Sequence, residues 1–544
     1  MGLFGYKLGN SIAARRSQFA RPARAFIAQP EPRTIGLPAR GQQLISGFFL
    51  FAGHIVEAPD TSIWDLESPS EFFEQELHGF SWLDHLAAEG SPRARALAKQ
   101  WLWEWIERYG KGAGVGWTPQ LTGRRVVRVI NHALLLLIKE DASNQKAYFK
   151  VLGQQADFLA SRWQAEPAGL GRFEALTGLV YCGLALEGKK RHLKPAMKNL
   201  ARQSVEYINE EGAIPSRNPE ELMDIFTTLA WAAHAIGEAE EQPLRDHLLA
   251  MERIVPSLRS LRLGDGGLVH FHGGGRGMDG RLDQSLADAS ISLPARVGGA
   301  MGYHRIANSG SVLILDGGEQ VLRDAGSFSA LCFEFSTGRQ PLIVNTGPGM
   351  LFGDEWWDAS RTLLAHSGVS VAETSPSVDP VKKGEPIIPI VERSENSEFE
   401  MLASSQAGFV PTFGLKHYRS LEMARTGLLI RGKDTVIAEG KNDRATFDMW
   451  KAKHKKSEIP YAARFHIAPD VNMELGMRDT AVTMTTPKGE VWLLRAPKAK
   501  MSIEKSAYMQ YGRLNPRAAN QVVVSAAAIN YEGVIEWSLT RLEA

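Results

Sequence analysis

Cysteine is scarce in this 544-residue sequence: there are two, Cys182 and Cys332, and both lie in apolar runs. A disulfide framework and a cysteine-based zinc site are therefore excluded. The sequence has 62 Lys and Arg residues and 61 Asp and Glu residues, so its net charge is +1 and neither sign of charge is in excess. This balance gives no case for nucleic-acid binding, and we expect no nucleic-acid partner. The sequence also lacks a Walker loop, a GxSxG elbow, an HExxH pair and a CxxC pair.

Long hydrophobic runs are missing as well. The apolar run at residues 44–53 is about half the length of a membrane span, so the sequence predicts no transmembrane segment. The first forty residues carry seven Lys and Arg residues against one acidic residue, Glu31, and no apolar stretch follows directly, as it would in a cleavable signal peptide. Two interpretations stay open: a basic arm that leads to a buried segment, or a surface that contacts an anionic membrane or an acidic polymer.

The sequence does contain a change of periodicity near its middle. From about residue 90 to 262 apolar residues recur at helical spacing, and Ser91-Pro92 and Asn218-Pro219 each combine a helix cap with a first-turn proline. After residue 264 short runs rich in Val, Ile, Phe and Thr alternate with turn residues, and hairpins are expected within 330–345 and 480–495. Four parts follow: a basic N-terminal arm and lead-in segment (1–68), a helical domain (69–262), a glycine-rich linker or binding loop (263–285) and a large antiparallel β-sandwich (286–544).

One stretch of the strand-rich half combines side chains suited to sugar chemistry. His366 begins an apolar strand five residues after Arg361, and an imidazole that titrates near neutrality can take up or release a proton in a cleft. Trp356 and Trp357 are adjacent on the preceding loop, and paired indole rings there would offer a platform for sugar faces.

This stretch resembles the heparinase II/III-like family of polysaccharide lyases. The family pattern is a strand with Glu and Ser-Gly, a strand ending in Asn or Asp plus Gly, an Arg-containing loop, and Ala-His before a Val-rich strand. The sequence matches it from Glu334 to Val371, except that Thr337 separates Ser336 from Gly338. The resemblance implies a multidomain α and β fold: an N-terminal (α/α) toroid, which is an incomplete barrel of helical hairpins, followed by a large antiparallel β-sandwich.

Family members cleave uronic-acid polysaccharides by β-elimination, which needs a neutralised substrate carboxylate, a base near C5 and an acid at the glycosidic oxygen. The resemblance therefore implies a carbon–oxygen lyase acting on an acidic polysaccharide, with His366 as acid/base. We expect Arg172 and Arg217 to neutralise the carboxylate, because a guanidinium binds it through two contacts. The other expected substrate contacts are Trp357, Arg361, Glu334, Asn345, His417 and Arg419.

The sequence departs from the family pattern at three places. Family members carry an Asn-His pair and a Tyr in the toroid, but residues 169–172 contain no Asn or His and residues 216–221 contain no Tyr. Some members hold a structural zinc through a histidine two residues after the catalytic one. Gly368 occupies that place, so we expect no metal and no cofactor. The family implies a place in the cell envelope or periplasm, whereas the sequence leaves compartment and oligomeric state open.

Two other functions stay open. A glycoside hydrolase on the same toroid needs two carboxylates about 5–10 Å apart, and its candidates are Glu76, Glu174, Asp224 and Glu334. A non-catalytic glycan-binding or polysaccharide-assembly protein would keep the scaffold without the toroid Asn-His pair and Tyr. An ultraviolet-absorbing unsaturated sugar end would identify the lyase, and a new reducing end without absorbance would identify the hydrolase.

Overall fold

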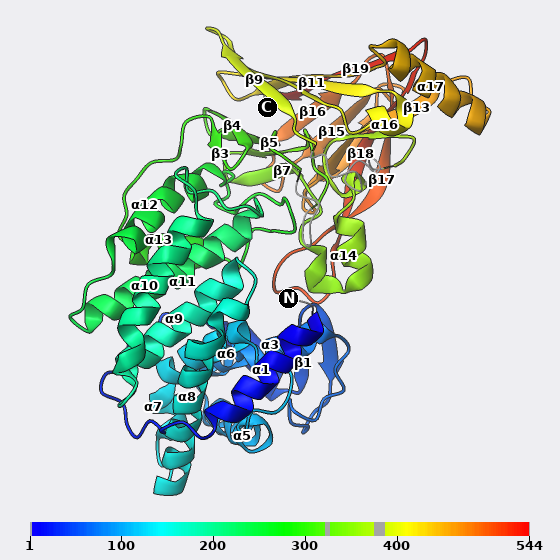
Figure 1. Ribbon diagram of the computed structural model, residues 1–544. Helices are drawn as coiled ribbons and strands as arrows, with labels where there is room; N and C mark the ends of the chain where they lie inside the picture. The colour runs from blue at the N-terminus through cyan, green and yellow to red at the C-terminus, as the bar shows by residue number, and fades with distance from the viewer. Residues whose placement is uncertain (1–2, 321–326, 375–386, 543–544) are drawn as a thin grey trace. The chain divides into compact units, whose positions relative to one another are not determined.

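The computed structural model describes residues 3–320, 327–374 and 387–542 (Figure 1). The chain forms two compact units that do not coincide with the two halves of the sequence. Unit 1 comprises Met1–Gly212, Met223–Ile254 and Gly280–Ser292, and unit 2 comprises Ala213–Leu222, Val255–Asp279 and Leu293–Ala544. Two short segments from the helical region therefore belong to the strand-rich unit.

Unit 1 is mainly helical, with one antiparallel hairpin formed by β1 (Phe48–Phe51) and β2 (His54–Glu57). Its helices, of which α11 begins and α12 ends in unit 2, are α1 (Leu3–Ser17), α2 (Pro38–Ile45), α3 (Glu71–Gly79), α4 (Ser81–Glu89), α5 (Pro92–Tyr109), α6 (Pro119–Asn131), α7 (Ala133–Leu137), α8 (Ala142–Arg162), α9 (Leu170–Ala185), α10 (Leu193–Tyr207), α11 (Pro219–Glu238), α12 (Arg245–Ser260) and α13 (Arg281–Asp288).

Local signals explain where these helices begin and how closely they pack. The Ser91 hydroxyl accepts a hydrogen bond from the Ala94 amide at 3.2 Å, and Pro92 fills the first helical position, as its missing N–H allows. Helices α6 and α9 approach closely at Gly123 and Gly178, where a Cβ on Gly178 would lie 2.7 Å from the Gly123 Cα. Larger residues at these positions would force the two helices apart.

Unit 2 contains two antiparallel sheets. The first, in spatial order, is β14 (Asn472–Gly476), β15 (Ala481–Thr485), β16 (Val491–Arg495), β19 (Glu532–Arg541), β12 (Leu429–Ile437), β11 (Lys416–Ala424), β10 (Phe399–Gln406) and β9 (Ile390–Glu395). The second is β17 (Lys500–Tyr508), β18 (Arg517–Ala528), β13 (Ile459–Ile467), β7 (Gln340–Val344), β6 (Phe333–Thr337), β5 (Ser311–Asp316), β4 (Tyr303–Asn308) and β3 (Gly299–Ala300), with β8 (Val369–Val371) also paired to β13.

Aromatic side chains join the two sheets across a common core. Phe333 on β6 stacks on Trp537 of β19, with ring centroids 5.9 Å apart, and Phe335 meets the edge of Trp492 on β16 at 5.4 Å. All four rings are buried, which makes unit 2 a β-sandwich closed by interdigitated side chains. The expected fold class is thus confirmed, and so are the two hairpins, seen as β6–β7 and β15–β16.

The expected four-part division differs from the two units. Residues 1–68 hold α1, α2 and the β1–β2 hairpin, all within unit 1. The expected linker at 263–285 is divided, because its part up to Asp279 belongs to unit 2 and its remainder opens α13 in unit 1. No helix in the described part of the chain is long and apolar enough to cross a membrane.

Candidate active site

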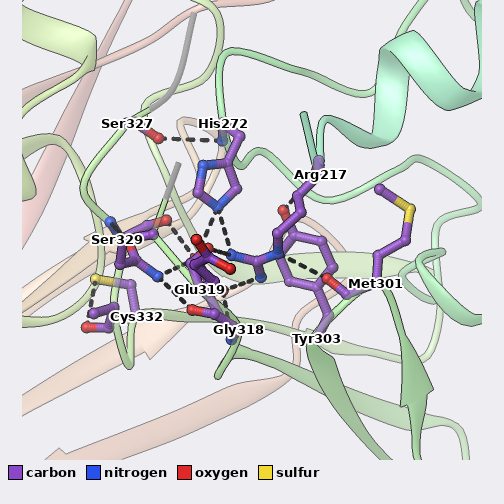
Figure 2. Close-up of polar contacts among 12 residues, drawn as sticks. Arg217, His272, Met301, Tyr303, Gly318, Glu319, Ser327, Ser329 and Cys332 are labelled. Atoms are coloured by element: carbon purple, nitrogen blue, oxygen red, sulfur yellow. Dashed lines mark hydrogen bonds and ion pairs between the residues drawn. The ribbon is translucent and has the colours of Figure 1, made fainter. Parts of the chain in front are cut away.

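Figure 2 shows a buried polar cluster in unit 2 that includes Arg217, His272 and Ser329. Asp316, the last residue of β5, is the carboxylate that these three side chains share. Its side chain is 0% exposed. The Arg217 Nη2 donates to Oδ1, the Ser329 hydroxyl donates to Oδ2 at 2.6 Å, and His272 Nε2 lies 3.1 Å from Oδ2. Burial by itself would raise the pKa of Asp316, but the charge of Arg217 and the contact with His272 hold that pKa well below its usual value.

The cluster attaches two segments of unit 2 that lie within the helical region of the sequence. Arg217 belongs to 213–222 and His272 to 255–279. The Arg217 guanidinium also donates to the Met301 carbonyl at 2.8 Å and to the Glu319 carbonyl, and it lies over the Tyr303 ring at 4.7 Å. Arg217 and His272 both have left-handed backbone angles, φ 55° and 50°, which side chains other than glycine seldom adopt.

This geometry changes the role expected for Arg217. The guanidinium is buried and already bound to a protein carboxylate, so the structure gives it a structural place instead of one facing a substrate carboxylate. Arg172 lies in unit 1, at the start of α9, where its Nε donates to the Glu166 carbonyl at 2.6 Å and its Nη1 donates to Gln203 at 3.1 Å. These local contacts fix the beginning of its own helix.

His366 lies between the short helix η4 (Leu363–Ala365) and β8. The residue is 4% exposed, and its ring stacks on Phe271 with centroids 6.3 Å apart and planes at 10°, so one face of the imidazole is packed within unit 2. Its Nδ1 lies 2.9 Å from the Thr362 carbonyl, and since a carbonyl only accepts, Nδ1 carries the proton. Burial lowers the pKa of His366 to about 4, so the imidazole is neutral at pH 7 and its Nε2 carries a lone pair.

Glu334 and Asn345 bind the backbone of His270, of Asn345 itself and of Ser367, the residue after His366. Glu334 accepts hydrogen bonds from the backbone amides of His270 at 3.1 Å and Asn345 at 2.6 Å. The Asn345 side chain donates to the His270 carbonyl at 3.0 Å and accepts from the Ser367 amide at 2.8 Å. Both side chains are fully buried, so they position the chain around His366 in place of the substrate contacts expected for them.

His417 and Arg419 form a second buried cluster on β11. Asp434 on β12 accepts two hydrogen bonds from Arg419, at 2.7 and 3.1 Å, and lies 3.0 Å from His417 Nε2. Trp537 also donates to this carboxylate, at 3.0 Å. Because all these side chains are buried and bound to one another, the structure gives His417 and Arg419 a structural place within the sandwich, not the substrate contact expected from the sequence.

Trp357 and Arg361 remain at the surface of unit 2, on and just after α14 (Asp354–Ser360). Both are partly exposed, and the Arg361 guanidinium lies over the Trp357 ring at 5.3 Å. An aromatic face beside a cation suits an acidic sugar, because the ring covers apolar C–H groups while the guanidinium meets a carboxylate.

The residues present do not fit the zinc site known from some family members. A Cβ on Gly368 would lie 2.3 Å from the Cys332 sulfur, so the packing leaves no room for a histidine at this position.

Three acidic residues of the hydrolase alternative are paired with arginines. Glu174 and Glu76 both contact the Arg124 guanidinium, at 2.6 and 3.3 Å, and Asp224 pairs with Arg281 at 2.9 Å, all in unit 1. The fourth candidate, Glu334, lies in unit 2.

Asp316 and Asp434 are the two central residues that the sequence analysis missed. A signal existed for Asp434: a hairpin turning at Thr426-Gly427 places Arg419 opposite Asp434, and the structure has this register. For Asp316 no local signal exists, because His272 is 44 residues away and Arg217 is 99 residues away.

Comparison with known proteins agrees with this architecture. Residues 291–538 match the family described as "Heparinase II/III-like, C-terminal". The strand-rich part of the chain therefore resembles the domain that this family model describes, as the Glu334–Val371 stretch indicated.

Relatives that cover nearly the whole chain extend the comparison to unit 1. FtsZ-localized protein C from Caulobacter vibrioides is 26% identical over 560 residues, which span 96% of this chain and 93% of the relative. A heparinase III structure superposes with a TM-score of 0.69 at 13% identity, covering 99% of this chain and 90% of that one. A heparan sulfate lyase from Pedobacter heparinus has a TM-score of 0.56 at 14% identity and covers 99% and 88%. At these identities the two structures show the shared fold.

Proposed function

We propose that this protein is a polysaccharide lyase that cleaves a uronic-acid-containing polysaccharide of the cell envelope by β-elimination, with His366 as acid/base. The observation that carries the proposal is the state of this imidazole. Its Nδ1 proton is held by the Thr362 carbonyl and burial lowers its pKa to about 4, so Nε2 is unprotonated at neutral pH and is the ring atom that can accept a proton. The match of residues 291–538 to the family model and the lyase fold of the solved relatives support this assignment.

In the proposed elimination the imidazole of His366 carries out both proton transfers. His366 Nε2 takes the proton from C5, the C5–H electron pair becomes the C4–C5 double bond, and the C4–O bond breaks toward the leaving sugar. The imidazolium then returns its proton to the departing oxygen. The substrate carboxylate needs a cation, and we assign that contact to Arg361, whose guanidinium lies over the partly exposed Trp357 ring at 5.3 Å.

The test is a panel of heparan sulfate, chondroitin, hyaluronan, alginate and gellan-type polymers, assayed for the absorbance of an unsaturated sugar end. We expect turnover of at least one polymer and a loss of about 10²–10⁴-fold in kcat for His366→Gln. The amide of glutamine lies near the position of Nε2 and does not replace the Nδ1 bond to the Thr362 carbonyl, so the urea midpoint of this variant is measured alongside to show that it is folded in the assay. The matched control is His454→Gln, at an exposed position on α17 (Lys441–His454), which should keep full activity.

Absence of absorbance with every polymer would refute the lyase. Equal turnover by His366→Gln and the unsubstituted protein would remove His366 from the chemistry.

A non-catalytic glycan-binding or assembly protein is the second candidate. The low exposure of His366 and the occupied guanidinium of Arg217 favour it, as does a full-length relative named for localisation with FtsZ. Polymer affinity that is retained without any absorbance, and that falls in Trp357→Ala, would decide for this candidate. In that case His366→Gln should leave affinity unchanged.

A further inference from the structure

The N-terminal helix α1 packs against unit 1 through its small and polar side chains. Asn10, Ala14 and Ser17 are buried, and the Asn10 side chain accepts a hydrogen bond from Arg162 at the end of α8 at 2.9 Å. The Tyr6 hydroxyl donates to Glu166 at 2.6 Å. These contacts hold the helix in place without burying a large apolar side chain.

Three large apolar side chains of α1 lie on its opposite, solvent-exposed face. Phe4, Leu8 and Ile12 follow one another at four-residue spacing and are 82%, 50% and 42% exposed. At about 100° per residue this spacing makes one row along the helix, opposite Asn10 and Ala14. Phe19, just beyond the helix, is 85% exposed. Large apolar side chains at this spacing are usually buried against the rest of the protein, whereas these three are exposed to water.

The charged residues within the segment 3–30 all have positive sign. Arg15 and Arg16 are exposed in the last turn of α1, and Arg21 and Arg24 are exposed just after it. Lys7 is also exposed and lies 3.6 Å from Glu71. No acidic residue precedes Glu31, although the whole chain is nearly neutral. The excess of positive charge is therefore concentrated beside the apolar row.

We propose that α1 is a docking surface for an anionic lipid membrane, lying in the plane of the bilayer surface. Phe4, Leu8, Ile12 and Phe19 enter the boundary between headgroups and acyl chains, while the arginines meet lipid phosphates. An acidic polymer would use the charges but offers no medium for the apolar row, so the membrane accounts for both features. The inner face of α1 stays on α8, so docking requires no unfolding of unit 1.

The full-length protein would be sedimented with vesicles of phosphatidylcholine alone and with vesicles containing phosphatidylglycerol. We expect binding to the anionic vesicles that weakens with salt. The variant Phe4→Ser/Leu8→Ser/Ile12→Ser should lose at least tenfold in affinity, and Arg15→Glu/Arg16→Glu should lose more than tenfold, since each basic residue near the surface contributes about fivefold. The matched control is Leu134→Ser/Ile138→Ser, at exposed positions of unit 1 outside α1, which should bind normally.

Insertion can be detected at a single position. Both native cysteines are buried, so Phe4→Cys would place an accessible thiol on the row for a polarity-sensitive dye, whose emission should shift to the blue on anionic vesicles. Unchanged binding by the triple serine variant would overturn the proposal. So would binding to dextran sulfate without binding to anionic vesicles, which would show a purely electrostatic arm. These outcomes are independent of polymer cleavage, because α1 contains none of the residues of the proposed reaction.

Discussion

Replacing Asp316 with asparagine keeps the shape of the side chain and removes its charge. The carboxylate is 0% exposed and the Arg217 side chain is 9% exposed, so Asp316→Asn would leave a buried guanidinium without an anion. Breaking a buried ion pair from one side costs about 3–5 kcal/mol. We expect the free energy of unfolding of unit 2 to fall by that amount at pH 7.

Hydrogen–deuterium exchange can locate this loss. Segments 213–222 and 255–279 are attached to the sandwich through Arg217 and His272, so their amides should exchange about 100-fold faster or more in Asp316→Asn. Helix α8 in unit 1 serves as the internal control and should exchange at its original rate. Unchanged exchange of the two segments would refute the assignment of Asp316 as their attachment point.

A double substitution distinguishes the effect of the lost charge on stability from the effect of the changed side-chain shape. Adding Arg217→Met to Asp316→Asn removes the unpaired cation, and replacing both partners of a buried pair is often close to neutral. We expect the double variant to recover most of the lost stability. A double variant as unstable as the sum of both single ones would contradict this electrostatic account.

Three further outcomes follow from the buried groups of unit 2. Burial lowers the pKa values of His366 and His466 to about 4 and about 3, so the unfolded state binds more protons below pH 6.5. The free energy of unfolding should therefore fall as the pH is lowered from about 6.5 toward 4, by up to about 3 kcal/mol for His366. The urea midpoint at each pH measures this fall, and a midpoint that does not change with pH would contradict it. Gly368→Ala should cost about 1–3 kcal/mol in thermal unfolding, and Cys332→Ala should relieve the loss by removing the sulfur that the new Cβ would meet. Dialysis against a chelator should leave the melting temperature unchanged, because this packing does not fit the family's zinc site.

The features that could be predicted from the sequence depend on neighbours in the chain. The hairpin around Thr337-Gly338 follows from turn residues between apolar runs, and the starts of α5 and α11 follow from a cap residue and a proline. The stretch from Glu334 to Val371 carries enough of the family pattern to indicate the sandwich and its family.

The features that could not be predicted depend on long-range pairing. Arg217 has the chemistry of a substrate contact, and only the position of Asp316 shows that its charge is already matched. His366 was expected in a cleft because histidines at strand ends often are, whereas Phe271 packs on one face of its ring. The role of Arg419 depends on the register between β11 and β12, which pairs Arg419 with Asp434. A shift of this register by one residue would place the Arg419 side chain on the opposite face of the sheet.

The division of unit 2 into three separate stretches of sequence limits how the protein can be rearranged. A fragment that starts where the family match starts, at residue 291, would omit both Arg217 and His272 and carry Asp316 as a buried anion with no counter-ion. Recombination that exchanged the sandwich at this boundary would meet the same penalty. A fragment that is to contain the Asp316 cluster therefore has to include residues 213–222 and 255–279 as well as the sandwich.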